Sequence, residues 1–373
     1  MVVVRDIISL LNDLAPWRLA EDWDNCGLMV GHMDHAVTKA ALALDATLQT
    51  VAEARNIGAQ VLITHHPLIF KPLKRIDLSN ESARVAASAL ESGIAVISAH
   101  TNLDASTVGV ARALSQKLDL QDTEVLEPTQ GKLCKLVVFV PLGYEDLIRQ
   151  AVFNAGAGQI GEYHGCSFAG RGEGTFEPGP DSLPFRGVTG RLERVAETRL
   201  EFLADEWKVS QVIRAVKSVH PYEEVAYDIY PLSNSAGGTG FGCVGYLNNE
   251  LKINELAAML KQKLPLSGLR IAAASDKPIR KVAVMPGSGG SYLDLAQSRG
   301  VDVLISGDLC YHQARQAEFM GLCLIDVGHF ASERPALDFL ADALGRHAQK
   351  NGLGFDIQVL SCELDPWQYV GSE

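Results

Sequence analysis

Histidine and carboxylate side chains follow three strand-like apolar runs that lie far apart in the chain. They are His65 and His66 after the run at 61–64, Asp104 after the run at 94–98, and His329 and Glu333 after the run at 322–326. Imidazole and carboxylate together suit a divalent transition metal such as Zn, Fe, Mn or Co. Five such ligands exceed the needs of one closed site, and a bridging carboxylate would let them serve two ions. The sequence therefore predicts a two-metal protein.

A single histidine or aspartate at the end of a strand is more commonly a capping residue, a turn former or a hydrogen-bonded polar residue. The prediction therefore rests on the recurrence of this pattern after three separate strands. Carboxyl ends of parallel strands meet at one edge, where open α/β proteins build their sites. His329 and Glu333 are four residues apart, which places them on one face of a helical turn. Adjacent histidines diverge, so His65 and His66 could serve different ions, and Pro67 favours an extended backbone at His66.

Alternating strand-like and helix-like segments at both ends of the chain must position these side chains. This alternation predicts an α/β protein with a two-lobed core of largely parallel sheet flanked by helices. The middle is richer in glycine and follows the order strand, helix, strand, strand, helix, strand, which predicts an inserted α+β ferredoxin-like domain. We therefore expect core halves at 1–131 and 249–373, an insert at 132–248, and a loop at 233–238 leading back to the core.

Composition excludes several classes of protein. The chain has 373 residues, of which 47% are hydrophobic and 21% charged, and this length favours two or three domains. Seven scattered cysteines do not form a disulfide framework, and neither a signal peptide nor a membrane-spanning run is apparent, so we expect a cytoplasmic protein. The net charge of −12 argues against nucleic-acid binding.

Further polar residues near these motifs are weaker candidates. His100 precedes Asp104 by four residues and is either a buried hydrogen-bonding group, the favoured interpretation, or a partner of the ligands or a proton shuttle. Asp24 and Asn25 either order a loop over the metals or form an ordinary turn. Cys26 is a candidate soft ligand or nucleophile, but nothing in the sequence pairs it with a base.

The C-terminal half carries two more candidates. The run Gly287-Ser288-Gly289-Gly290 between a strand and a helix is either a phosphate cradle or, as we favour, a plain tight turn, because it lacks a P-loop lysine. Asp308 and His312 are four residues apart at the same expected sheet edge, and we place both behind the ligands, where they would shape a substrate pocket.

Four segments together resemble the Nif-three-like family, whose members carry the label GTP cyclohydrolase I type II homolog. The segments are DWDNCGLMVG at 22–31, ITHHPL at 63–68, SAHTNLD at 98–104 and GHFASE at 328–333. HPYEEVAYD at 220–228 is similar to the hallmark of the insert in the longer bacterial members. That insert is similar to small trimeric copper-tolerance and signalling proteins of ferredoxin-like fold.

The resemblance implies a dinuclear metal centre and a self-associated protein. Its ligands would be His65, His66, Asp104, His329 and Glu333, with Glu333 as the bridge. It further implies a homohexamer whose metal sites face an internal cavity. The HPYEE run is either a functional site or an interface of the insert.

Two hypotheses about function remain open. The first is a metal-dependent hydrolase acting on a nucleotide or another small phosphorylated or cyclic amide substrate. The alternative is a metal-handling or chaperone protein without enzymatic activity, or an interaction scaffold in which the metals stabilise the fold. The ligand types do not identify the metal.

Overall fold

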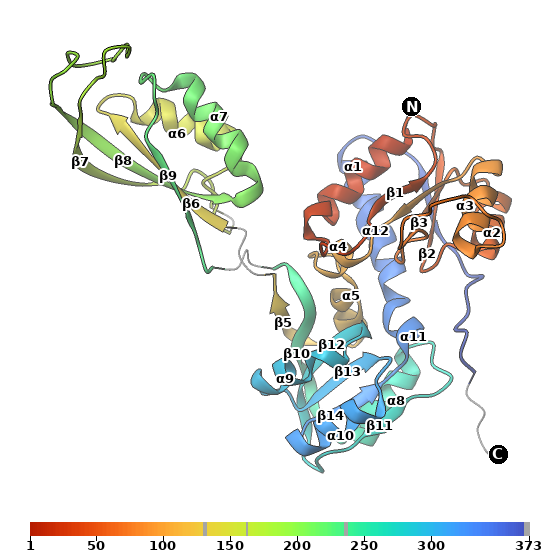
Figure 1. The fold of residues 1–373 in the computed structure, drawn as a ribbon. Coiled ribbons are helices and arrows are strands. Elements are labelled where there is room, and N and C mark those ends of the chain that lie inside the picture. The colour runs from red at the N-terminus through yellow and green to blue at the C-terminus, as the bar shows by residue number, and fades with distance from the viewer. Residues whose placement is uncertain (130–132, 162, 235–237, 369–373) are drawn as a thin grey trace. The chain divides into compact units, whose positions relative to one another are not determined.

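The computed structural model describes residues 1–129, 133–161, 163–234 and 238–368 and divides into two compact units (Figure 1). One unit joins Met1–Pro128 to Gly238–Glu373, and the other spans Thr129–Gly237. Residue 132, the first of the predicted insert, and residues 235–237 of the predicted loop lie outside the described residues. The sequence placed the end of the insert at 248, whereas the strand that begins at Gly240 pairs with strands of the first unit.

The first unit contains a five-stranded sheet in the order β1-β4-β3-β2-β15. Its strands are β1 (Gly27–Val30), β2 (Lys39–Ala43), β3 (Val61–Thr64), β4 (Ala95–Ser98) and β15 (Asp356–Val359). All pairs are parallel except β1 with β4. Every residue of β3 and β4 is buried, as expected of apolar strands covered on both faces. The associated helices are α1 (Val4–Leu14), η1 (Trp17–Leu19), α2 (Leu48–Asn56), α3 (Glu81–Glu91), α4 (Thr101–Asp104) and α5 (Val110–Lys117).

A six-stranded sheet in the order β11-β14-β13-β12-β10-β5 completes this unit. Its strands are β5 (Gln121–Pro128), β10 (Gly240–Leu251), β11 (Arg270–Ala272), β12 (Ile279–Ser288), β13 (Val303–Gly307) and β14 (Cys323–Asp326). Only the central pairs β12–β13 and β13–β14 are parallel, and the outer pairs are antiparallel. The associated helices are α8 (Ile253–Lys263), η3 (Gly290–Tyr292), α9 (Leu293–Ser298), α10 (Tyr311–Met320) and α11 (His329–Glu333).

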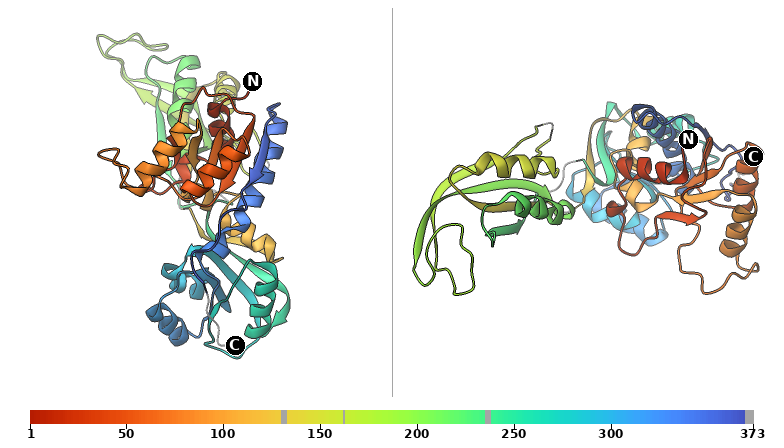
Figure 2. Two further views of the ribbon diagram at one scale, coloured as in Figure 1. Left: turned by 90° about the vertical axis from the view of Figure 1, so that its right-hand side faces the viewer. Right: turned by 90° about the horizontal axis from the view of Figure 1, so that it is seen from above.

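The C-terminal segment connects the two sheets. Helix α12 (Pro335–Lys350) follows α11 directly, and its apolar residues Ala336, Leu340 and Leu344 are buried in the core cluster formed by α1 and the first sheet. Both figures show α12, in blue, beside the red and orange N-terminal elements (Figures 1 and 2). Strand β15 then pairs with β2. The strand β15, which follows both sheets in the sequence, therefore belongs to the first sheet.

The second unit is an antiparallel sheet with two long helices. Its elements are β6 (Leu133–Pro141), α6 (Glu145–Asn154), β7 (Phe168–Phe176), β8 (Glu193–Asp205), η2 (Glu206–Lys208), α7 (Val209–Val219) and β9 (Tyr227–Pro231). The strand order is β7-β8-β6-β9, and all pairs are antiparallel. Apolar residues of β6, β8, α6 and α7 form its core. Across the described parts of both units, no helix combines the length and apolar character that a bilayer crossing requires.

Candidate metal centre

The carboxyl ends of β3, β4 and β14 bring the five predicted ligand residues together. His65 and His66 follow β3, Asp104 is the last residue of α4, and α11 carries His329 and Glu333. The Nε2 atoms of His66 and His329 lie 3.3 Å apart, although 263 residues separate them in the chain. His65 Nε2 lies 3.7 Å from Asp104 Oδ1. The five residues therefore lie close together, but not at one edge of a single sheet as expected: β3 and β4 belong to the five-stranded sheet and β14 to the six-stranded sheet.

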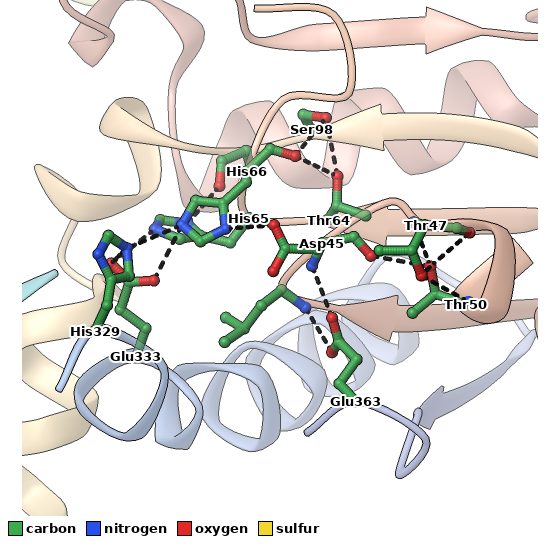
Figure 3. A network of polar contacts seen from close by, with 12 residues as sticks. Asp45, Thr47, Thr50, Thr64, His65, His66, Ser98, His329, Glu333 and Glu363 are labelled. Atoms are coloured by element: carbon green, nitrogen blue, oxygen red, sulfur yellow. Dashed lines mark hydrogen bonds and ion pairs between the residues drawn. The ribbon is translucent and has the colours of Figure 1, made fainter. Parts of the chain in front are cut away.

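Glu333 lies between three imidazole rings. Its Oε1 is 3.1 Å from His329 Nε2 and 3.8 Å from His65 Nε2, and its Oε2 is 3.1 Å from His66 Nε2. Its carboxylate is buried, and in Figure 3 it points toward the rings of His66 and His329. A carboxylate surrounded in this way could bind a metal ion together with these imidazoles.

Two atoms at the centre are buried without a hydrogen bond. They are His65 Nε2 and Glu333 Oε2: neither makes a hydrogen bond of good geometry with a described residue, and the polar neighbour of Glu333 Oε2 is the ion-pair partner His66 Nε2 at 3.1 Å. His65 is only 2% exposed and Glu333 5%. Buried polar atoms in native proteins almost always have a partner, and leaving one unsatisfied costs about 1–3 kcal/mol. Imidazole and carboxylate lone pairs buried this close together fit a metal cation.

A hydrogen bond at Nδ1 orients every imidazole of the centre. The Nδ1–H groups donate to Ala99 O from His65 (3.0 Å), to Asp45 Oδ1 from His66 (2.9 Å), to Asp24 Oδ1 from His100 (3.0 Å) and to Asp308 Oδ2 from His329 (2.7 Å). This tautomer leaves the Nε2 lone pairs free to bind a metal, and such partners commonly orient metal-binding histidines.

Backbone hydrogen bonds in turn hold the supporting residues (Figure 3). Glu363 accepts from the amides of Leu44 and Asp45, both at 2.8 Å, and so fixes the end of β2 that carries Asp45. Thr64 Oγ1 donates to His66 O at 2.9 Å and contacts Ser98 Oγ across the β3–β4 pair. These contacts fix the backbone at His66 and help direct its ring.

Opposed electrostatic effects set the protonation of the metal-free centre. Burial lowers the pKa of His65 to about 4, so its ring is neutral. Burial also disfavours the charged form of His66, but Asp45 and Glu333 outweigh it and raise the pKa to about 10. A hydrogen bond to Glu333 raises the pKa of His329 to about 9. Burial and the charge of Glu333 raise the pKa of Asp104 well above its usual range. Without a metal, protons on His66 and His329 would balance the carboxylates.

Comparison with known protein families identifies the family to which this chain belongs. The model of the family described as Duf34/NIF3 (NGG1p interacting factor 3) matches residues 2–366. The chain belongs to the DUF34/NIF3 family. A Bacillus subtilis relative named GTP cyclohydrolase 1 type 2 homolog is 38% identical over 367 residues, which are 98% of each chain.

Solved structures of relatives have the same mixed α/β fold. A Bacillus cereus protein related to NIF3 is 38% identical, with a TM-score of 0.84 and 99% of each chain covered. A Staphylococcus aureus protein is 28% identical, with the same TM-score and coverage. The family resemblance inferred from the sequence motifs is therefore confirmed.

Two groups of side chains in this family member could hold a metal ion. One consists of His65, His66 and His100, and the other of His66, His329 and Glu333, with the potential ligand atoms of each group within 4.8 Å of one another. The His100 ring centre lies 5.2 Å from that of His65, so His100 belongs to the centre itself. Asp104 joins through its 3.7 Å approach to His65.

Asp24 is the main organiser of the loop before β1. Besides His100, it accepts hydrogen bonds from the amide and hydroxyl of Thr101 and from Cys26 Sγ at 3.1 Å. Burial opposes ionisation, but these donors outweigh it and hold the pKa of Asp24 far below its usual range. Burial raises the pKa of Cys26 to about 12, so its thiol is a poor nucleophile. Asn25 donates to Ile69 O at 2.5 Å and joins this loop to the segment after β3.

Asp45 is the supporting residue that sequence reasoning missed. It follows the apolar strand β2, which is the same signal that identified His65, Asp104 and His329. Asp308 has the predicted place behind the ligands, where it holds His329. His312 instead has its ring edge against Tyr311 and is absent from the residues that line the cavity beside the centre.

The Gly287–Gly290 run is not a separate tight turn: Gly287 and Ser288 end β12, Gly290 begins η3, and the run packs against α11. The amide of Gly287 donates to Ser332 Oγ and that of Gly289 to Ser306 Oγ, both at 2.9 Å. Gly287 has a φ of +68°, and a Cβ there would lie 2.5 Å from Glu333 Oε1. The glycine is therefore needed for close packing against the central carboxylate.

The centre opens into a cavity of about 550 Å³ within the first unit. His66, His100, Asp104, His329 and Glu333 form one part of its wall. The remaining wall includes the aromatic rings of Trp23, Phe241 and Tyr292 and the carboxylates of Glu21 and Glu127. Its volume lies in the range of small-molecule sites, about 300–1,000 Å³.

Proposed function

We propose that the protein binds two divalent metal cations and is a metal-dependent hydrolase of a small molecule. The observation that carries this proposal is the pair of buried, unsatisfied atoms His65 Nε2 and Glu333 Oε2 among converging imidazoles. His65 and Asp104 would hold one ion, His66 and His329 the other, and Glu333 would bridge them. Zn, Fe, Mn and Co all suit this donor set.

The cavity supports a nucleotide or another small phosphorylated or cyclic amide compound as the substrate. Bound ions would supply Lewis-acid chemistry, which activates a water nucleophile and stabilises charge on a phosphoryl or carbonyl oxygen. The rings of Trp23, Phe241 and Tyr292 offer faces against which a planar substrate can pack. The name of the Bacillus subtilis relative, GTP cyclohydrolase 1 type 2 homolog, is compatible with such a substrate.

Metal handling without turnover is the second candidate. The side chains of His66 and His329 are 25% and 37% exposed, so solvent reaches one part of the centre. Ligands accessible from one side permit exchange of an ion with a partner. Exchangeable metal without turnover on a broad substrate panel would favour this role over hydrolysis.

Metal stoichiometry tests the shared premise of both candidates. Elemental analysis of freshly purified protein should give about two ions per chain. His329→Ala and Glu333→Ala should lower this number, and Glu333→Ala should remove the paired site because it deletes the bridge. His312→Ala is the matched control, since it removes an exposed imidazole outside the cavity. Full metal content and turnover in Glu333→Ala would overturn the assignment.

We further propose that the second unit has a ferredoxin-like fold and that the chain forms a homohexamer in the cytoplasm. The element order and the strand order β7-β8-β6-β9 support the fold. The family resemblance supports the assembly. Light scattering of the purified protein should give six times the chain mass, and a monomer at micromolar concentration would contradict it.

A further inference from the structure

The HPYEE run of the second unit lies beside a cavity that the metal chemistry does not use. This cavity has a volume of about 290 Å³, near the lower end of small-molecule sites. Its lining comes from the end of β7, from β8, from the segment 178–186 and from the segment 222–226. All of these belong to the second unit, so the cavity is formed independently of the metal centre.

His220 does not line this cavity, but it holds the turn that leads to Tyr222, which does. Its Nε2–H donates to Phe139 O at 3.1 Å, and its Nδ1 accepts from the amide of Tyr222 at 3.1 Å. Both ring nitrogens are thus used within the unit, and burial lowers the pKa of the imidazole and keeps it neutral. The histidine of the motif is therefore a structural residue, and the residues after it face the cavity.

Glu197 on β8 is the carboxylate that the cavity presents to a ligand. Its Oε1 accepts from the hydroxyl of Tyr222 at 2.9 Å. Its Oε2 lies over Gly174 of β7, where a Cβ would come within 2.3 Å of it, so the glycine leaves the space that this oxygen occupies. Among the described residues, Oε2 has neither a hydrogen-bond donor nor a cationic side chain bound to it. One oxygen of Glu197 is thus oriented by Tyr222, and the other is available.

Aromatic rings stand beside this carboxylate. The ring centre of Phe185 lies 6.0 Å from that of Tyr222 and 5.8 Å from that of Tyr144. Phe185 is 43% exposed, and the guanidinium of Arg186 lies over its ring at 5.7 Å from the centroid. The Phe185 ring therefore makes a cation–π contact with the side chain of Arg186, the next residue in the chain.

Glu223 and Glu224 add negative charge at the cavity. Glu223 Oε2 accepts from the amide of Leu183 at 2.8 Å and so joins the segment that carries Phe185 to the HPYEE turn. Against the three carboxylates Glu197, Glu223 and Glu224, the cavity lining contains one cation, Arg186. Carboxylates combined with aromatic faces favour a cationic ligand and disfavour a phosphate or carboxylate.

We propose that this cavity binds a small organic cation, a guanidinium or ammonium group on an apolar stem. The cationic group pairs with Glu197 Oε2, and the stem packs against Phe185 and Tyr222, displacing Arg186 from the ring. The same chemistry is offered by a free amine or by an arginine or lysine side chain of a polypeptide.

Titration calorimetry on the full-length protein tests this with matched probes. Butylguanidine should bind saturably, and butylurea, its uncharged isostere, should bind at least about tenfold more weakly. Nα-acetylarginine amide represents the polypeptide source, and tighter binding of either guanidinium probe identifies which source fits. Glu197→Gln keeps an acceptor for Tyr222 but removes the charge, and should weaken butylguanidine about tenfold. Phe185→Leu should weaken it as well.

The matched control is Glu201→Gln, on the same strand as Glu197 but outside the cavity. It should leave butylguanidine binding unchanged, which excludes a general effect of net charge. Equal affinities for butylguanidine and butylurea, unchanged affinity in Glu197→Gln, or no saturable binding of butylguanidine at low millimolar concentration would each overturn the proposal. Melting curves of each variant verify that the fold is intact.

Discussion

The imidazoles of the metal centre differ in how much their charge must change when a cation binds. His65 is already neutral, because burial lowers its pKa to about 4. His66 and His329, with pKa values of about 10 and about 9, are protonated at pH 7 in the metal-free protein. A histidine must be deprotonated to bind a metal. On the proposed function, metal binding would therefore be coupled to proton release at these two residues.

We predict that loading the metal-free protein at pH 7 releases at least about two protons per chain, one each from His66 and His329, with a further contribution from Asp104, whose pKa is also raised. Because both pKa values lie above 7, the protons are bound before loading and lost on loading, so affinity should rise between pH 6 and 8. The rise should approach tenfold per pH unit for each proton released. Calorimetry in two buffers of different ionisation enthalpy measures the number. Metal binding without proton release would contradict the assigned roles of His66 and His329.

The carboxylates behind the imidazoles should control metal affinity without binding the metal. Asp45→Asn and Asp308→Asn keep the size of the side chain but remove the charge that faces His66 Nδ1 or His329 Nδ1. Each should weaken metal binding by about 10–100-fold. Competition with a chromophoric chelator measures the affinity, and Asp338→Asn, an exposed carboxylate of α12, is the control. Wild-type affinity in both variants would show that these aspartates have no positioning role.

The residues that the structure brings together could be grouped from the sequence because strand ends carry a one-dimensional signal. A buried strand followed by histidine or aspartate is visible in the sequence, and within the first sheet the parallel strands β3 and β4 end at one edge. That β14 of the second sheet ends beside them is not visible in the sequence. The role of Asp24 was visible only in part, because its contacts to His100 and Thr101 span more than 75 residues. No local pattern specifies such a pairing. The converging Nε2 atoms depend on ring orientations that only the folded chain defines.

At the scale of elements, the β12–η3 junction and α11 form one packed unit around Glu333. Gly287→Ala should both strain the junction and displace the carboxylate, because the new Cβ would lie 2.5 Å from Glu333 Oε1. Gly300→Ala is a matched control: its φ of +64° imposes the same strain, but nothing lies within 4 Å of its added Cβ. Both variants should lose about 1–2 kcal/mol of stability. Only Gly287→Ala should lose metal, as measured by elemental analysis, and equal metal content in the two would contradict the packing argument.

The sequence could not show which of the two sheets helix α12 packs against. Its apolar periodicity predicts a helix, but the same pattern fits packing against either sheet. The structure places its buried residues against the N-terminal elements, and β15 then extends the first sheet. The predicted division into N-terminal and C-terminal halves missed this return. The position of this C-terminal segment depends on the pairing of β15 with β2, which are far apart in the chain. No local sequence pattern specifies that pairing.

At the scale of the whole molecule, the metal centre links segments from both ends of the chain within one compact unit. His65, His66 and Asp104 come from the first third of the sequence, and His329 and Glu333 from its last fifth. An ion held between them stabilises only conformations in which both sets are in place. The second compact unit, Thr129–Gly237, contributes none of these ligands.

Chelation should therefore destabilise the first unit selectively. An ion at about 100 times its dissociation constant stabilises the folded state by about 2.7 kcal/mol, which for a unit of this size corresponds to about 5–10 °C in Tm. Hydrogen exchange should show faster exchange after chelation at the end of β3, in α4 and in α11. Exchange in 133–234 should be unchanged, because no ligand lies there. Re-addition of metal should restore protection in wild type but not in Glu333→Ala. Equal loss of protection in both units would mean that chelation acts on the whole chain and not through this centre.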